Sequence, residues 1–248
     1  MNTSKEHSPV VVIKEVEKAF GENQVLKGFS LTVSKGENVV VLGRSGTGKS
    51  VLIKCIVRLV DPDQGSIHVL GTNMLQLKHD ELDAMRAKIG FLFQSSALYD
   101  SMTVGQNLEF PLRRHRKKNI RTDEKLLVKS ALESVGLTGT QEMSPAELSG
   151  GMRKRIGIAR TLILNPEVML YDEPTTGLDP ITGREINRLM LDVQEKYNTS
   201  SIIISHDMNC VKMTANRVVV LIDGTCYAEG TYEELKRSQD KQVKQFFD

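Results

Sequence analysis

The sequence has few cysteines and no long hydrophobic run, and each absence excludes a class of protein. Its three cysteines, Cys55, Cys210 and Cys226, are far apart and odd in number, so they offer neither a disulfide framework nor a zinc-binding pattern. The longest apolar runs, such as 218–222, fall far short of the ~20 residues that cross a bilayer. The first ten residues lack the apolar stretch of a secretory signal. We therefore expect a cytoplasmic protein that contacts a membrane only through a partner.

The charge is nearly balanced, which argues against a nucleic-acid partner. A formal net charge of +2 over 248 residues gives no strong attraction to a polyanion. A hydrophobic content of 40% without tandem repeats predicts one large domain over 1–248. The basic block RRHRKK at 113–118 is either a solvated surface or a contact for acidic lipid headgroups or an acidic partner loop.

Hydrophobic patterns divide the chain into an antiparallel start and a mostly parallel core. Alternating apolar residues at 11–16 and 29–33 predict half-buried antiparallel strands. Short continuous apolar runs are typical of strands covered on both faces by helices. These runs are 39–42, 89–93, 168–171, 201–204 and 218–222. The pattern predicts an α/β fold, with a helical subdomain inserted at about 96–163.

Two further helices are marked by local signals. Asp179 and Pro180 suit the N-cap and first position of a helix. The amphipathic pattern at about 232–247 predicts a C-terminal helix that ends in Phe246 and Phe247. These two aromatic residues either dock on their own domain or contact a second subunit.

The segment GRSGTGKS at 43–50 matches the phosphate-binding pattern G-x-x-x-x-G-K-[ST]. A buried strand precedes it and a helical segment follows, so its backbone N–H groups and the helix N-terminus can cradle phosphates. We expect Lys49 to reach the β- and γ-phosphates and Ser50 to ligate Mg²⁺. The nucleotide-binding candidates in this loop are Gly43, Arg44, Ser45, Gly46, Thr47, Gly48, Lys49 and Ser50. The sequence thus predicts a P-loop NTPase fold of the RecA-like type that binds a nucleoside triphosphate.

Two adjacent acids end a buried strand in VMLYDEP at 168–174. Asp172 is the candidate second ligand of Mg²⁺. Glu173, one residue further, is the candidate catalytic group that polarises a water near the γ-phosphate.

A second glycine-containing segment, LSGGMRKR at 148–155, predicts another anion site. Ser144 and Glu147 just before it fit a capping box, and Ser149 can cap the next helix. Gly150 and Gly151 leave the first N–H groups of that helix bare of side chains. The cations at 153–155 oppose the helix dipole unless an anion offsets them. One nucleotide does not need two cradles, so we expect the second to serve the nucleotide of a second copy, head to tail.

These segments resemble the ATP-binding cassette (ABC) ATPases along nearly the whole chain. LSGGM is similar to the family signature LSGGQ, with Met152 in place of glutamine, so the helix cap depends on Ser149 alone. The resemblance implies ATP and Mg²⁺ as cofactors and hydrolysis of ATP as the reaction.

The resemblance assigns roles to further residues. It implies that Gln94 contacts the metal or the attacking water and that His206 contacts the γ-phosphate. It implies that TGLD at 176–179, including Asp179, crosses a dimer interface. It implies that Phe20 stacks on adenine, whereas Phe20 taken alone could equally be a core residue.

Within the family, the chain resembles the ATPase subunits of Mla/Mce-type bacterial lipid transporters. This resemblance depends on residues 91–112, on Met152 and on DPITG at 179–183. It implies transmembrane permease partners, a Mce-type lipid-binding subunit, phospholipid cargo and a peripheral place on the inner membrane.

Several alternatives stay open at this stage. They are a regulatory ABC ATPase of the cell-division type, an importer subunit for another small solute, and an ABC ATPase acting on DNA or ribosomes. A kinase or a GTP switch would leave LSGGM without a role.

Overall fold

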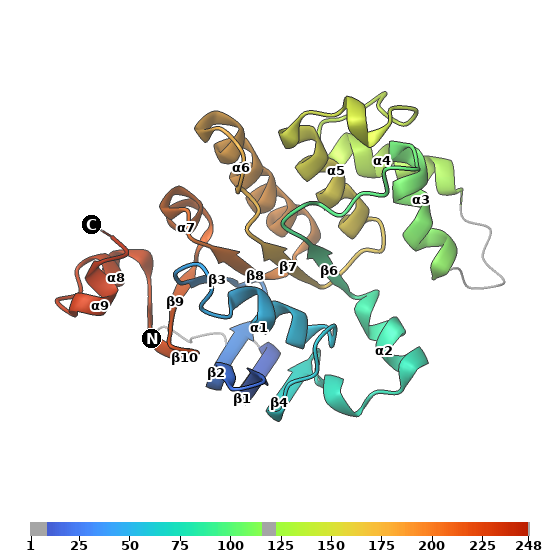
Figure 1. Ribbon diagram of the computed structural model, residues 1–248. Coiled ribbons are helices and arrows are strands. Elements are labelled where there is room, and N and C mark those ends of the chain that lie inside the picture. The colour runs from blue at the N-terminus through green and yellow to red at the C-terminus, as the bar shows by residue number, and fades with distance from the viewer. Residues whose placement is uncertain (1–8, 116–122, 248) are drawn as a thin grey trace, which may run out of the picture.

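The computed structural model describes residues 9–115 and 123–247, and its strands form two sheets (Figure 1). The four-stranded sheet has the order β2-β1-β4-β5 and the six-stranded sheet the order β10-β9-β3-β8-β7-β6. The strands are β1 Pro9–Phe20, β2 Asn23–Ser34, β3 Asn38–Leu42, β4 Gln64–Val69, β5 Thr72–Asn73, β6 Ile89–Leu92, β7 Val168–Asp172, β8 Ser200–Ser205, β9 Arg217–Ile222 and β10 Thr225–Gly230.

The predicted antiparallel start of the chain is confirmed. β1 pairs with β2 in antiparallel register, with Val11 opposite Val33 and Ile13 opposite Leu31. On its other side β1 pairs with β4, also antiparallel. The alternating apolar residues of β1 are fully buried, which is why this register is favoured.

The predicted parallel core is also confirmed. The five continuous apolar runs became β3, β6, β7, β8 and β9, and all neighbouring pairs among them are parallel. β10 adds an antiparallel edge strand beside β9. Side chains on these strands point alternately to two hydrophobic clusters, one on each face of the six-stranded sheet.

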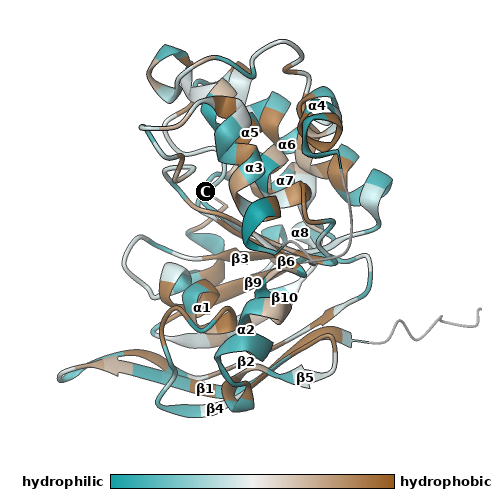
Figure 2. Cartoon of the chain, turned by 90° about the vertical axis from the view of Figure 1, so that its right-hand side faces the viewer, coloured by the Kyte–Doolittle hydropathy of each residue, from teal (hydrophilic) through white to brown (hydrophobic). Residues whose placement is uncertain are grey.

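The two faces of the six-stranded sheet are covered by different layers. Figure 2 shows its hydrophobic strands between a helical layer, which includes α3 to α7, and a second layer with α1, α2 and the antiparallel sheet. The helices are α1 Lys49–Ile56, α2 His79–Arg86, α3 Val104–Arg114, α4 Glu124–Ser134, α5 Gly150–Leu162, α6 Pro180–Tyr197, α7 Met208–Thr214, α8 Tyr232–Lys236 and α9 Lys241–Lys244, with 3-10 turns η1 Met74–Gln76 and η2 Pro145–Glu147.

The helices α3, α4 and α5 contact one another and fall between β6 and β7 in the chain. They lie within the span 96–163 for which the sequence predicts an inserted helical subdomain; its boundaries stay a prediction. The basic block 113–118 begins with Arg113 and Arg114 in the last turn of α3, and its residues 116–118 lie outside the described residues. Arg114 Nη2 contacts Asp83 Oδ2 at 2.7 Å, and Arg113 Nη2 contacts Glu109 Oε2 at 2.5 Å.

The predicted helix caps are present. Asp179 Oδ1 accepts hydrogen bonds from Ile181 N and Thr182 N at the start of α6. At η2, Glu147 Oε2 accepts from Ser144 N at 2.6 Å, as a capping box requires.

The C-terminal segment contains two short helices where the sequence predicts one. α8 ends before Arg237, and Asp240 starts α9 by accepting hydrogen bonds from Gln242 N and Val243 N. An N-cap aspartate in mid-segment favours a new helix start over continuation. Phe246 and Phe247 pack on the core of their own domain, and the Phe247 and Tyr232 rings are 5.4 Å apart.

Within the described residues, 9–115 and 123–247, none of the helices combines the length and apolar character that a bilayer crossing demands.

Candidate functional site

The segment 43–50 forms a tight loop between β3 and α1. Gly48 precedes the first residue of α1 with φ of 99°, a left-handed conformation that glycine tolerates. A Cβ on Gly48 would lie 2.6 Å from Val25 Cγ1, so a side chain would also collide with β2. Thr47 Oγ1 donates to Arg44 O at 2.8 Å and closes the loop. The backbone thus adopts the compact shape that the phosphate-binding pattern predicts.

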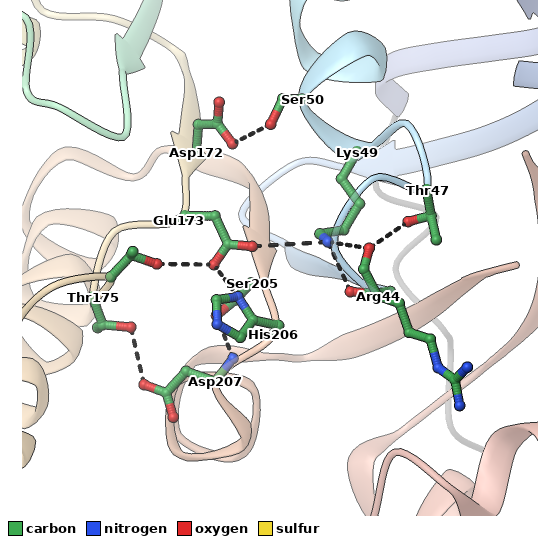
Figure 3. A network of polar contacts seen from close by, with 12 residues as sticks. Arg44, Thr47, Lys49, Ser50, Asp172, Glu173, Thr175, Ser205, His206 and Asp207 are labelled. Carbon is green, nitrogen blue, oxygen red and sulfur yellow. Dashed lines mark hydrogen bonds and ion pairs between the residues drawn. The ribbon is translucent and has the colours of Figure 1, made fainter. Parts of the chain in front are cut away.

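Lys49 reaches across this loop from the start of α1 (Figure 3). Its ammonium donates to the carbonyls of Gly43 at 2.7 Å and Arg44 at 2.9 Å, and lies 3.8 Å from Glu173 Oε1. Burial lowers the pKa of Lys49, while the carboxylates of Glu173 and Asp172 act against that change. The charged amine lies where an anionic oxygen could take the place of these acceptors.

Ser50 and Asp172 meet at the carboxyl end of the sheet. Ser50 Oγ donates to Asp172 Oδ1 at 2.9 Å, joining α1 to β7. Burial raises the pKa of Asp172, and the Ser50 hydrogen bond opposes that rise. A hydroxyl and a carboxylate are oxygen ligands of the kind Mg²⁺ takes, which it completes with phosphate oxygens and water. The donor set therefore fits Mg²⁺ held together with a polyphosphate. Among the residues described, no cluster of three or more histidines, cysteines or acids offers an all-protein metal site.

Glu173 lies at the centre of a polar network beyond β7 (Figure 3). Its backbone is left-handed, with φ of 49°, an uncommon conformation for a residue with a Cβ. Its Oε2 lies 2.8 Å from His206 Nδ1 and accepts from Thr176 Oγ1 at 3.3 Å. The strand end and the loop after β8 thus bring an acid and a histidine side by side.

A cavity of about 350 Å³ connects most of the predicted residues. Its lining comprises Phe20, Val25, Ser45, Gly46, Gly48, Lys49, Ser50, Val51, Gln94, Glu173 and His206. Phe20 is 51% exposed at its edge, so the core alternative for this residue is wrong. Sequence reasoning missed Val25 and Val51, which carry no motif and enter the lining only through the sheet and helix packing.

The second glycine segment, 148–155, lies outside the lining of this cavity. Ser149 Oγ accepts from Met152 N at 3.2 Å and caps α5, as expected. Within the described chain, Ser149, Gly150 and Gly151 are not part of the 350 Å³ cavity lining. Asp179 lines a second cavity of about 290 Å³, along the segment 175–180, which adjoins the first at His206.

Two side chains around the site make contacts that were not predicted. Arg44 Nη2 donates to Gln245 Oε1 at 2.6 Å, which links the loop to the C-terminal segment. Lys154 of α5 is 5% exposed, and its ammonium donates to the backbone carbonyls of Gln94 and Glu173. Its position within a run of cations gave no sign of burial.

A glycine loop with its lysine, opposite a strand-end aspartate and glutamate on a parallel sheet, defines a P-loop NTPase. Residues 26–176 match the family described as ABC transporter. The chain is 36% identical over 236 residues to the probable ribonucleotide transport ATP-binding protein mkl of Mycobacterium leprae, covering 95% of this chain and 68% of that protein.

A second relative and a solved structure point to the same family. The methionine import ATP-binding protein MetN of Brucella abortus is 40% identical over 223 residues, covering 90% of this chain and 60% of its own length. A dimeric, post-hydrolysis structure of the ATP-binding cassette MJ0796 with ADP and Pi matches with a TM-score of 0.81 and 31% identity, covering 89% of this chain and 98% of that one. The chain belongs to the ABC transporter family. It is an ATP-binding and ATP-hydrolysing subunit of such a transporter.

Proposed function

We propose that two copies of this chain close head to tail around two Mg²⁺–ATP, and that hydrolysis drives lipid transport by a membrane complex. One observation supports the proposed dimer. The cavity beside the P-loop contains one set of site residues, while the capped, glycine-bearing start of α5 is outside it. A second copy supplies the missing set. The dimeric form of the MJ0796 cassette supports this arrangement.

The residues of the cavity divide by the part of the nucleotide that they contact. Phe20, exposed at the end of β1, stacks on adenine. The backbone N–H groups of 43–50 and the Lys49 ammonium hold the β- and γ-phosphates.

The metal is held by Ser50 and Asp172, with Gln94 as a further contact. Mg²⁺ held there would neutralise the charge that develops on the phosphate oxygens.

Catalysis depends on Glu173. Its carboxylate orients or deprotonates the water that attacks the γ-phosphate in line, while the bond from the γ-phosphorus to the bridging oxygen breaks and ADP leaves. His206 contacts the γ-phosphate next to it. Lys49 and the backbone of Ser149–Gly151 from the second copy stabilise the developing charge. The segment 176–179, with Asp179, crosses the interface between copies.

The transport role requires partners. The helical subdomain at about 96–163 passes the closing motion to transmembrane permease subunits, which hold the chain at the cytoplasmic face of the inner membrane. A Mce-type subunit presents phospholipid to them. Residues 91–112 and Met152 support the lipid assignment, while the 40% identity to MetN supports an importer of a small solute as second candidate.

The role of Glu173 is tested by Glu173→Gln. The amide cannot accept the proton of water, so we expect loss of ATP turnover with ATP binding retained and an ATP-trapped dimer in light scattering. Glu195→Gln, exposed on α6, is the control. Full turnover in Glu173→Gln would remove Glu173 from its role.

The shared site is tested by Ser149→Arg. A long cation at the start of α5 blocks the second copy's nucleotide, so turnover is lost while binding of ATP to the monomer persists. Thr138→Arg, at an exposed position between α4 and η2, is the control. Intact hydrolysis by Ser149→Arg would contradict the dimer.

The cargo is tested by purification from detergent-solubilised membranes. Co-purification of a permease, a lipid-binding subunit and phospholipid supports the lipid role. A permease with a solute-binding protein for an amino acid, and no bound lipid, supports the importer.

A further inference from the structure

Lys154 is a buried cation that contacts two separate catalytic segments. It lies in the second turn of α5, on the helix that begins at Ser149. Its ammonium donates to the backbone carbonyl of Gln94 and, at 3.3 Å, to that of Glu173. One side chain therefore joins the segment after β6 to the segment after β7.

Burying an ammonium is unfavourable unless hydrogen bonds and opposite charges offset the loss of water. Burial lowers the pKa of Lys154, and the carboxylates of Asp172 and Glu173 act in the opposite direction. An apolar side chain of the same length would fill this space without that cost. The presence of a cation at this buried position thus points to a role beyond packing.

Both acceptor segments have an uncommon backbone. Glu173 is left-handed with φ of 49°, and Ser96 and Ala97, just after Gln94, have φ of 62° and 46°. Such conformations persist only where surrounding contacts hold them. Arg160, further along α5, donates to Ser96 O at 2.9 Å and to Ala97 O at 2.6 Å. Lys154 and Arg160 of α5 thus both hydrogen-bond to the segment that contains Gln94. Of these two cations, only Lys154 also contacts Glu173.

We propose that Lys154 is a positioning residue for ATP hydrolysis, which holds the backbones of Gln94 and Glu173 at the spacing that the reaction needs. The inference rests on the proposed function, because it takes Gln94 and Glu173 as the groups that act on water and phosphate. It also joins the two sites of the dimer. The start of α5 faces the nucleotide of the second copy, whereas Lys154 on the same helix fixes the catalytic groups of its own chain.

The test compares three substitutions of Lys154 in the full chain. Lys154→Met keeps the length and removes the donors and charge, Lys154→Gln keeps a donor, and Lys154→Arg keeps both. Lys129→Met is the matched control, because Lys129 is 60% exposed on α4 and pairs only with Glu133 among the contacts described. Each variant is measured for kcat and KM with Mg²⁺–ATP, for ATP binding and for its thermal unfolding midpoint.

Displacement of reacting groups by about 1 Å costs on the order of a hundredfold in rate. We expect Lys154→Met to lower kcat by about ten- to a hundredfold with KM changed less than about threefold. Lys154→Arg recovers most of kcat, Lys154→Gln recovers part, and Lys129→Met matches the parent.

Two results would overturn the inference. One is a parental kcat in Lys154→Met. The other is joint loss of ATP binding and of the unfolding midpoint in Lys154→Met without recovery in Lys154→Arg, which would mean that Lys154 serves packing alone. Ser149→Arg separates the two proposals. If it retains turnover, the shared site fails; if it is inactive while Lys154→Met is unaffected, only the inference fails.

Discussion

Gly48 is under two constraints at once, a left-handed backbone and a close neighbour. Gly48→Ala places a Cβ on a left-handed backbone, which is strained, and within 2.6 Å of Val25 Cγ1. We expect a loss of about 1–3 kcal/mol in the free energy of unfolding, measured with urea. Gly46→Ala is the matched control, because Gly46 has φ of 82° but nothing within 4 Å of its Cβ position. An equal loss in both variants would mean that the contact with Val25 contributes nothing.

Asp63 fixes the end of β1 from which Phe20 projects. It accepts hydrogen bonds from Lys18 Nζ and Ala19 N, both at 2.7 Å, and these bonds, the Lys18 one first, lower the pKa of Asp63. A lowered pKa in the folded state adds stability above the unfolded value, near 3.8, and this stability is lost as the pH falls through the folded pKa.

We therefore expect Asp63→Asn to be less stable than the parent at pH 7, and the difference to shrink below about pH 4. Urea unfolding across this range measures it. Asp61→Asn, at a side chain that is 71% exposed, serves as the control. A difference between parent and Asp63→Asn that is constant with pH would contradict the assignment.

For single residues, the sequence patterns predicted which side chains form the site better than they predicted the contacts that these side chains make. The residues Lys49, Glu173 and His206 were predicted, and they do line one cavity. The buried position of Lys154 was missed, because a lysine between two arginines is usually solvated. Only the packing of α5 against the sheet determines which of these cations is buried.

The helices α5 and α6 approach closely at their first turns. A Cβ on Gly151 would lie 2.6 Å from Thr182 Cγ2, and one on Gly150 would lie 3.2 Å from Leu178 Cδ2. Both glycines therefore have a packing role within the chain, beside the anion role that the sequence predicts.

We expect Gly151→Ala to destabilise the fold by about 1–3 kcal/mol through overpacking. Adding Thr182→Ser removes Cγ2 and keeps the hydroxyl that donates to Asp179, so the double variant regains most of the loss. Denaturant unfolding of the single and double variants measures this. Gly150→Ala is the milder control, because the Leu178 side chain can move. Additive effects of the two substitutions would exclude this contact as the cause.

Strands with a continuous apolar run were predicted well, whereas the division of the amphipathic C-terminal segment into two helices was not. The five parallel strands carry continuous apolar runs that fit burial on both faces. The segment 232–247 has one amphipathic pattern, yet the cap at Asp240 divides it into α8 and α9. The two hydrogen bonds that Asp240 accepts begin a new helix there, although the amphipathic pattern runs on.

At the scale of the whole molecule, the site joins segments that are distant in the chain. The pocket unites β1, the P-loop, and the ends of β6, β7 and β8. A ligand that bridges them should stabilise the entire fold, since it binds only when all are in place.

We expect Mg²⁺–ATP at about 100 times its Kd to raise the free energy of unfolding of Glu173→Gln by about 2.7 kcal/mol. Addition of EDTA removes most of this gain and stops hydrolysis in the parent. Lys49→Met is the control, since it loses the ammonium that holds the phosphates. Equal stabilisation of both variants in a thermal melt would exclude the P-loop as the binding site.

The sequence predicts that the start of α5 serves the nucleotide of a second copy, but the geometry of this pairing is not a property of one chain. The start of α5 and the cavity beside the P-loop belong to the same domain and are separate within it. The pairing that would join them depends on a second copy, which hydrophobic patterns within one sequence do not specify.

The hydrogen bond between Arg44 and Gln245 bears on how the molecule is best labelled. A fluorophore attached at residue 245 would lie beside the phosphate-binding loop, so its emission would report on nucleotide arrival. A bulky fusion at the same place would crowd that loop. Reagents meant to leave turnover undisturbed therefore belong at the opposite ends of the core strands, near the start of β1, where Val10 lies beside Glu167 and Ser200.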